Sequence, residues 1–229
     1  TNPDPTVATG RTTVSIDVYS DVVCPWCYIG KRRFAAGVAM VEDEVGVEVT
    51  YRAYQLDPTA APGAVSPVFD AYARKFGGPE RARQIIDHVT ATAAEVGLDF
   101  RMDRALRANS LLAHRLIWWA GRPDSSVPQD AMKERLLRAY FTDGLDIGDP
   151  EVLAGCAEEI GVDREVAAAF LDGDGGLAEV RGELEEAYRQ GISAVPTYVV
   201  GGQWAIPGAQ EPETFARVLR KLGEKAAAT

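Results

Sequence analysis

Two of the three cysteines in this 229-residue chain, Cys24 and Cys27, lie close together in the stretch SDVVCPWCYIGKRRF. A pair at this spacing can bind a metal, form a structural disulfide or exchange disulfides. A structural zinc site usually has four ligands, but the chain offers beyond this pair only Cys156 and two histidines, none paired at ligand spacing. A disulfide across so short a loop stabilises a fold by only about 2 kcal/mol. Redox chemistry is therefore the favoured interpretation.

The cysteine pair lies between a strand pattern and a helix pattern. Residues 12–19 alternate apolar and polar side chains, and the segment from the cysteines to about Glu44 has helical spacing. Cys24 should therefore start a helix, where free N–H groups and the helix dipole stabilise a thiolate. Cys27, one turn further on, would resolve the mixed disulfide. Pro25 and Trp26 between them are expected to tune the redox equilibrium.

Two further residues have alternative interpretations. Asp21, three residues before the first cysteine, either assists proton transfer or caps the turn. Cys156 falls at helical spacing with Val152 and Ile160, so it is expected to be a small core residue, with an accessory thiol as the alternative.

The order of patterns along the chain predicts how this site is positioned. A second strand over 46–54 completes a β-α-β opening, and the chain from Pro58 to about Gln190 is mostly amphipathic helix. Strands return in PTYVVGGQWAI, a hairpin joined by Gly201-Gly202, before a final helix. The helices between are expected in the segments 72–76, 85–97, 106–119, 132–140, 149–161 and 177–188.

Composition excludes several classes of partner. A net charge of −10 and a pI of about 4.8 argue against nucleic acid or an anionic membrane. No apolar run is long enough to span a bilayer, and the first ten residues do not resemble a signal peptide, so a cytoplasmic protein is expected unless a leader is missing. Nucleotide-binding motifs are absent, and the DGDGG stretch lacks calcium-loop ligands. We expect no metal and no cofactor besides the redox-active disulfide.

Five motifs in order resemble the DsbA-like branch of the thioredoxin superfamily. They are DVVCPWCYIGKRRF, YRAYQLDP, ANSLLAHRLIWWA, AYFTDGLDIGDPEVL and GISAVPTYVVGGQWAIPGAQ, and the likeness is greatest to the cytoplasmic FrnE-type proteins. The resemblance implies an α/β protein, a thioredoxin fold with an inserted all-helical domain. Residues 11–60 and 176–226 would form the thioredoxin part, and residues 61–175 the insertion.

The resemblance also implies roles for individual residues. Cys24 would be the attacking cysteine and Cys27 its partner. Pro196 would be the cis-proline that faces the sulfurs, and Val195 before it would offer backbone hydrogen bonds to an extended substrate.

Two polar residues on a predicted helix of the insertion are also candidates for the site. His114 and Asn109 either line the cleft opposite Cys24 and contact substrate, or form structural hydrogen bonds. The sequence leaves both interpretations open.

The sequence thus predicts a thiol–disulfide oxidoreductase, monomeric or homodimeric, acting on protein or small-molecule thiols and disulfides, with glutathione a candidate co-substrate. The alternative is a glutathione-dependent isomerase or transferase for an aromatic or polyketide-derived molecule. It is motivated by relatives of this family and by Trp26, Trp118 and Trp119. Those relatives usually have serine at the first cysteine position, and this chain keeps both cysteines.

Overall fold

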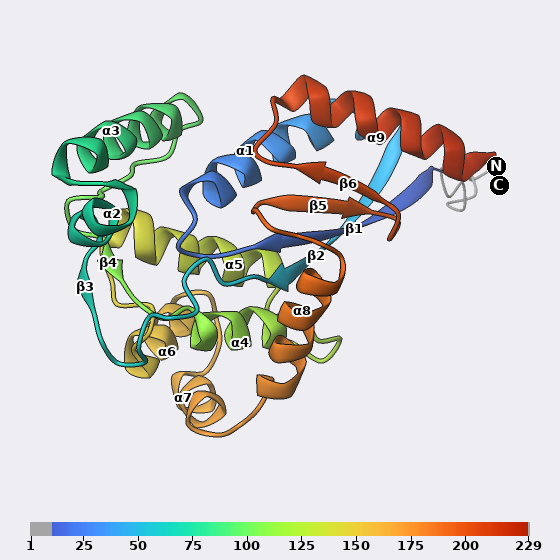
Figure 1. Cartoon of the computed structure of the whole chain (residues 1–229). Coiled ribbons are helices and arrows are strands. Elements are labelled where there is room, and N and C mark those ends of the chain that lie inside the picture. The colour runs from blue at the N-terminus through green and yellow to red at the C-terminus, as the bar shows by residue number, and fades with distance from the viewer. Residues whose placement is uncertain (1–10, 229) are drawn as a thin grey trace.

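A four-stranded mixed sheet lies at the centre of the protein (Figure 1). The computed structural model describes residues 11–228. The segment 1–10, which was not expected to be a signal peptide, lies outside the described residues. The strand order is β2-β1-β5-β6, with β2 parallel and β5 antiparallel to β1. The strands are β1 (Thr12–Ser20), β2 (Val45–Ala53), β5 (Thr197–Val200) and β6 (Trp204–Pro207).

Helices cover both faces of this sheet (Figure 1). Helices α1 (Pro25–Ala39) and α9 (Pro212–Ala227) lie together on one face. There the rings of Phe34, Tyr198 and Phe215 contact one another, with the Phe34 centroid 4.9 Å from that of Tyr198 and 5.2 Å from that of Phe215. Helix α8 (Leu177–Arg189) lies on the opposite side with α4 (Leu111–Ala120) and α5 (Gln129–Arg138). The site described below is held at the N-terminal end of α1 by these layers.

The remaining helices lie between β2 and α8 in the chain, as the sequence predicts. They are α2 (Val68–Phe76), α3 (Pro79–Glu95), α4 (Leu111–Ala120), α5 (Gln129–Arg138), α6 (Pro150–Glu159) and α7 (Arg164–Asp172). A π-helical turn, Ala139–Asp143, follows α5, and two short strands, β3 (Ser66–Pro67) and β4 (Leu106–Arg107), pair beside α2. The predicted order of β-α-β, helical block and α-β-β-α is confirmed.

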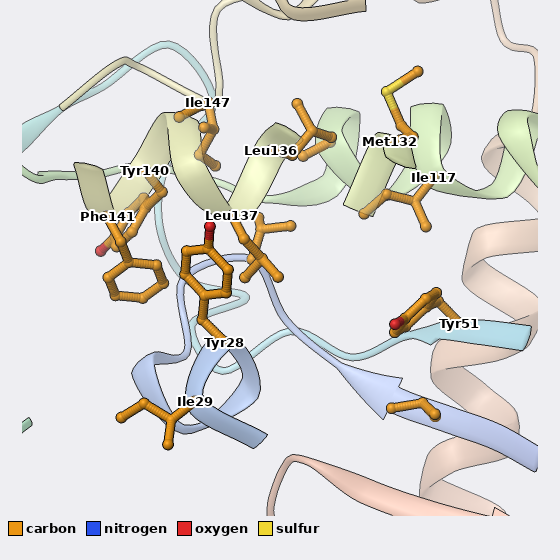
Figure 2. Packing of buried hydrophobic residues seen from close by; sticks show 14 of the residues in the cluster. Tyr28, Ile29, Tyr51, Ile117, Met132, Leu136, Leu137, Tyr140, Phe141 and Ile147 are labelled. Atoms are coloured by element: carbon orange, nitrogen blue, oxygen red, sulfur yellow. The ribbon is translucent and has the colours of Figure 1, made fainter. Parts of the chain in front are cut away.

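One hydrophobic core runs from the sheet into the helical block, and Figure 2 shows the junction. Tyr28 of α1 points towards Leu137 of α5 and Phe141 of the π-helical turn, while Ile29 lies buried on the other side of α1. The rings of Tyr28 and Phe141 are 6.1 Å apart, and Phe141 stacks on Phe100 at 4.5 Å. Because these side chains are buried from both sides, helix α1 is fixed against the helical block as well as against the sheet.

An ionic cluster at the surface reinforces the same junction. Glu134 of α5 accepts hydrogen bonds from Tyr28 Oη at 2.8 Å and from Arg32 Nη1 at 2.9 Å, and Lys31 Nζ is 3.0 Å away. Burial alone would raise the pKa of Glu134, but the bond from Arg32 and the charge of Lys31 lower this pKa to about 2. The carboxylate is therefore charged at neutral pH and ties α1 to α5.

Side chains from two helices close the β2 edge of the sheet. The Tyr51 N–H donates to Gln129 Oε1 at 2.8 Å, and Gln129 Nε2 donates back to the Tyr51 carbonyl at 3.2 Å. Further along, the Ala53 N–H donates to Glu183 Oε2 at 2.9 Å. These side chains take the hydrogen bonds that another strand would otherwise form with this edge.

Two expected helix boundaries are wrong. The first helix ends at Ala39 rather than near Glu44, because Val41 turns inward and is fully buried before β2 begins. The helix expected from 106 starts only at Leu111, because residues 106–107 pair with 66–67 as a strand and the Asn109 side chain accepts a bond from the Leu111 N–H at 2.9 Å.

Helix α7 has no counterpart among the expected helices. Asp163 caps its start by accepting a bond from the Val166 N–H. At its other end the buried Arg115 of α4 donates to the Phe170 and Gly175 carbonyls at 2.9 and 2.7 Å. The DGDGG stretch is therefore a loop held by a guanidinium.

Candidate active site

Cys24 lies at the junction of β1 and α1, as its sequence position predicts. It is the residue just before the helix, in an extended conformation, and Pro25 occupies the first helical position. An N–H group at the first helical position has no partner within the helix, so a proline, which lacks this group, loses no hydrogen bond there. Cys24 lines a cavity of about 730 Å³, and its Sγ donates to the Val195 carbonyl at 3.6 Å. The thiol thus reaches the cavity wall although the residue is only 3% exposed.

The expected cis-proline, Pro196, directly follows Val195, a residue of the cavity wall close to Cys24. The Val195–Pro196 peptide bond is cis, as the resemblance implied, and Val195 itself lines the cavity. Helix α1 approaches this wall closely at Gly30: a Cβ there would lie 3.1 Å from Pro196 Cγ and 2.8 Å from Tyr198 Oη. Glycine at position 30 therefore permits the close contact between helix and proline.

Cys27 lies behind Cys24 and is not among the residues lining the cavity. It is 3% exposed, and its N–H donates to the Cys24 carbonyl at 3.1 Å. Burial raises the pKa of Cys27 well above that of an ordinary cysteine, and a hydrogen bond with Cys24 and the negative charge of the Cys24 thiolate raise it further. Cys27 therefore keeps its proton at neutral pH.

A polar cluster is buried behind the two cysteines. Asp21 is fully buried and accepts a bond from the Leu56 N–H at 2.8 Å; its Oδ1 is 3.1 Å from His114 Nε2. Burial acts to raise the pKa of Asp21, but the bond to His114 and the Leu56 N–H lower it overall. Asp21 is thus a buried carboxylate, and the structure gives it neither a side-chain cap on α1 nor a place in the cavity wall.

Lys133 of α5 belongs to the same buried region and is 1% exposed. Burial lowers the pKa of this lysine, while the negative charges of Cys27, Asp21 and Cys24 act in the opposite direction. The positive charge of Lys133 in turn acts to lower the pKa of Cys27. A cation therefore lies where it favours ionisation of the inner thiol.

The two residues for which substrate contact was one of two interpretations lie away from the cavity. His114 is 2% exposed, and its Nε2 is shared between Asp21 and the Tyr54 carbonyl, 2.9 Å away. Asn109 Nδ2 donates to the Ala60 carbonyl at 2.8 Å. Neither lines the cavity, because their polar atoms are used inside the fold. The structural alternative describes both residues better than substrate contact.

Residues of helices α2 and α3 line the second wall of the cavity. Tyr72, Val89 and Tyr140 supply apolar surface there, and burial raises the pKa of both tyrosines. Trp26 reaches across from α1, with its ring centroid 5.7 Å from that of His88 on α3. The residue between the cysteines therefore links the redox pair to the helical wall.

Sequence reasoning missed Lys133, although a signal exists. Lys133 precedes Leu137 by one helical turn and follows Met132, and both neighbours are fully buried. A lysine in register with a buried stripe is a candidate for a buried charge.

Cys156 lies far from this arrangement. It is buried in the core at 1% exposure, as expected, and burial raises its pKa. Throughout residues 11–228, no three His, Cys, Asp or Glu side chains gather in a way that could hold a metal ion. No helix in this part of the chain is both long and apolar enough to cross a membrane.

Residues 15–220 match the DSBA-like thioredoxin domain family, so the chain belongs to this family. It is 27% identical over 209 residues to the protein YwbO of Bacillus subtilis (strain 168), covering 90% of this chain and 96% of the relative. It is also 33% identical over 60 residues to a 2-hydroxychromene-2-carboxylate isomerase of Sphingobium xenophagum, covering 26% of this chain and 31% of that enzyme.

Solved structures support the same assignment. A probable DsbA oxidoreductase from Streptomyces coelicolor superposes with a TM-score of 0.82 at 31% identity, covering 94% of this chain and 90% of that one. The cytosolic disulfide reductase DsbM from Pseudomonas aeruginosa, solved with GSH, superposes with a TM-score of 0.60 at 19% identity, covering 93% and 96%. The thioredoxin fold of the DsbA type is therefore confirmed.

Proposed function

We propose that this protein is a thiol–disulfide oxidoreductase in which Cys24 attacks and Cys27 resolves. The observation that carries the proposal is the unequal placement of the two thiols. Cys24 Sγ lies at the cavity wall beside Val195, whereas Cys27 is buried behind it with a raised pKa. The outer thiol can meet a substrate, and the inner thiol stays protonated until the mixed disulfide has formed.

The reducing direction proceeds in two steps. The Cys24 thiolate attacks one sulfur of a substrate disulfide, the substrate S–S bond breaks, and the departing thiolate takes a proton. Cys27 then loses its proton and attacks Cys24 Sγ, which releases the second substrate thiol. Two electrons pass to the substrate, and a Cys24–Cys27 disulfide remains; oxidation of a dithiol substrate is the reverse.

Several neighbouring residues have supporting roles in this proposal. The backbone beside the cis-proline, at Val195, aligns the substrate sulfur with Cys24. Lys133 favours the Cys27 thiolate in the second step, and Asp21, held by His114, balances the charge of Lys133. Pro25 and Trp26 set the redox equilibrium.

The substrates are protein or small-molecule thiols and disulfides, with glutathione as candidate co-substrate and no other cofactor. The structural likeness to DsbM, which was solved with GSH, motivates the choice of glutathione as a first probe. The cytoplasmic location expected from the composition makes a glutathione buffer the relevant reference for the direction of the reaction.

The test is equilibration of the wild-type protein with glutathione buffers of stepped ratio, together with an insulin-reduction assay. We expect one two-electron transition, assigned by mass spectrometry to the Cys24–Cys27 pair, and loss of insulin reduction in Cys24→Ser. Full activity in Cys24→Ser would overturn the mechanism. A Cys156→Ala variant, which keeps the redox pair, is the matched control.

A glutathione-dependent isomerase is the second candidate, and the local identity to 2-hydroxychromene-2-carboxylate isomerase favours it. The sequence suggested that three tryptophans could line a cleft for an aromatic substrate, but the structure supports this only for Trp26. Trp118 and Trp119 do not line the cavity, and Trp119 instead stacks on Phe170 at 5.6 Å. Glutathione-dependent turnover of an aromatic substrate by Cys27→Ser, without disulfide exchange, would favour this candidate over the first.

A further inference from the structure

We propose that Arg74 and Lys75 form an anion-binding rim on the cavity that selects small disulfides carrying carboxylates. Both residues lie in the last turn of α2, are exposed, and line the cavity that contains Cys24. This inference rests on the proposed thiol–disulfide exchange and adds the substrate class to it.

The charge of the cavity differs in sign from that of the protein. The chain carries a net charge of −10, yet the charged residues that line the cavity are three cations and one carboxylate. The carboxylate, Asp57, is already paired with Arg107 at 2.6 Å. Within residues 11–228, no carboxylate oxygen lies within 4 Å of the Arg74 guanidinium or the Lys75 amine, and Lys75 Nζ lies 5.5 Å from the ring of Phe76. Two positive charges thus remain for a ligand.

The shape of the cavity fits a small molecule. Its volume of about 730 Å³ falls in the range typical of small-ligand sites. Its floor is apolar, with Val68, Val89 and Tyr140 nearly fully buried, so it suits the hydrocarbon around a disulfide. Cations at the mouth and a thiol at the end are the groups that a carboxylate-bearing disulfide would meet.

A simpler explanation is that these cations only complement the C-terminal dipole of α2. That explanation accounts for basic residues in the last turn, but it does not require them to line the cavity. It also predicts no effect on the choice of substrate. Substrate charge therefore separates the two explanations.

The experiment compares three small disulfides of similar size: dithiodiglycolate, a dianion; hydroxyethyl disulfide, which is neutral; and cystamine, a dication. Reduced wild-type protein is mixed with each at low salt, quenched with acid, and the Cys24–Cys27 disulfide is quantified by mass spectrometry. Each rate constant is divided by that of dithiothreitol with the same disulfide, which removes differences in intrinsic reactivity. A single turnover needs no further reductant.

We expect the wild-type protein to prefer the dianion to the dication, against the sign of its net charge. In the double variant Arg74→Gln/Lys75→Gln, the ratio of dianion to neutral rates should fall about 10-fold. Raising the salt from 0.01 to 0.15 M should weaken the wild-type preference, because the screening length drops from about 30 to about 8 Å.

The control variant Arg217→Gln/Lys221→Gln loses the same two charges from exposed positions on α9 and should keep the wild-type ratio. A preference for cystamine in the wild-type protein, or equal ratios in the two double variants, would overturn the anion-binding rim while leaving disulfide exchange intact. Failure of the wild-type protein to react with all three disulfides would instead contradict the proposed function itself.

Discussion

The space in front of Cys24 and the interior behind Cys27 differ in their access to a substrate and in the charged groups that they contain. In front lies an open cavity lined by apolar side chains and cations. Behind lies a buried region that contains Asp21, His114 and Lys133. The two thiols have the same low exposure, so accessible area alone would not distinguish them. What separates their roles is which of these two environments each sulfur meets.

Removing the inner thiol should have the largest effect. In Cys27→Ser the outer thiol still attacks substrate but nothing resolves the product, so turnover should fall at least about 100-fold. Incubation with glutathione disulfide followed by mass spectrometry should show a stable adduct on Cys24. Undiminished turnover would mean that the environment behind Cys27 has no part in the reaction.

Glu134 tests whether helix α1 needs its attachment to α5, which carries Lys133. Because the folded pKa of Glu134, about 2, lies below the ordinary glutamate value of 4.5, its contribution to stability is present above pH 4.5 and is lost as pH falls towards 2. Glu134→Gln should lower the unfolding free energy by about 2 kcal/mol at pH 7, allowing for partial exposure.

Denaturant unfolding measured from pH 7 down to pH 2 checks this result. The difference between wild type and Glu134→Gln should shrink as pH falls. Glu185→Gln, at an exposed position on α8, is the matched control and should show no difference at any pH. A difference for Glu134→Gln that does not vary with pH would contradict the assignment of the ion cluster.

Lys133→Met tests the buried region directly. Without this cation the Cys27 thiolate loses stabilisation, so the resolving step should slow by about 10-fold, and its pH profile should move to higher pH. Stopped-flow decay of the Cys24 mixed disulfide over a pH series measures both quantities. Lys221→Met on the surface of α9 is the control. A slower rate with an unshifted pH profile would indicate a purely structural role for Lys133.

Cys156→Ala should have the smallest effect. The thiol is buried in the core and away from both environments, so its removal should cost about 1 kcal/mol of unfolding free energy and leave disulfide exchange unchanged. Thermal unfolding and the insulin assay measure the two outcomes. Loss of redox activity would give this cysteine a role that its position does not suggest.

The sequence predicted the region in front of Cys24 better than the region behind Cys27. The position of Cys24 follows from a local change of periodicity, from strand to helix, within one short segment. The facing Val195, with the cis-proline Pro196 after it, came from a distant motif recognised by resemblance. Both features are marked by residue types that stand out in the sequence: a closely spaced cysteine pair and a proline just before a strand.

Helical register marks Lys133 as a candidate buried charge, but the contacts among the residues of the buried region join distant parts of the chain, and no local pattern predicts them. Asp21 lies in the turn after β1, His114 on α4 and Lys133 on α5, and their packing decides that His114 bonds to a carboxylate rather than facing the cavity. Likewise, α4 starts at Leu111 rather than at Leu106, because residues 106–107 pair as a strand with residues 66–67. Long-range contacts of this kind override local helical spacing.

The most direct test of the account is the rate at which each thiol of the reduced protein reacts with iodoacetamide. Peptide mass spectrometry over a pH series resolves the three cysteines. We expect Cys24 to be modified first at neutral pH, with Cys27 reacting only in strongly alkaline solution because burial raises its pKa. Modification of Cys27 as fast as Cys24 at neutral pH would contradict the division of roles between the two thiols.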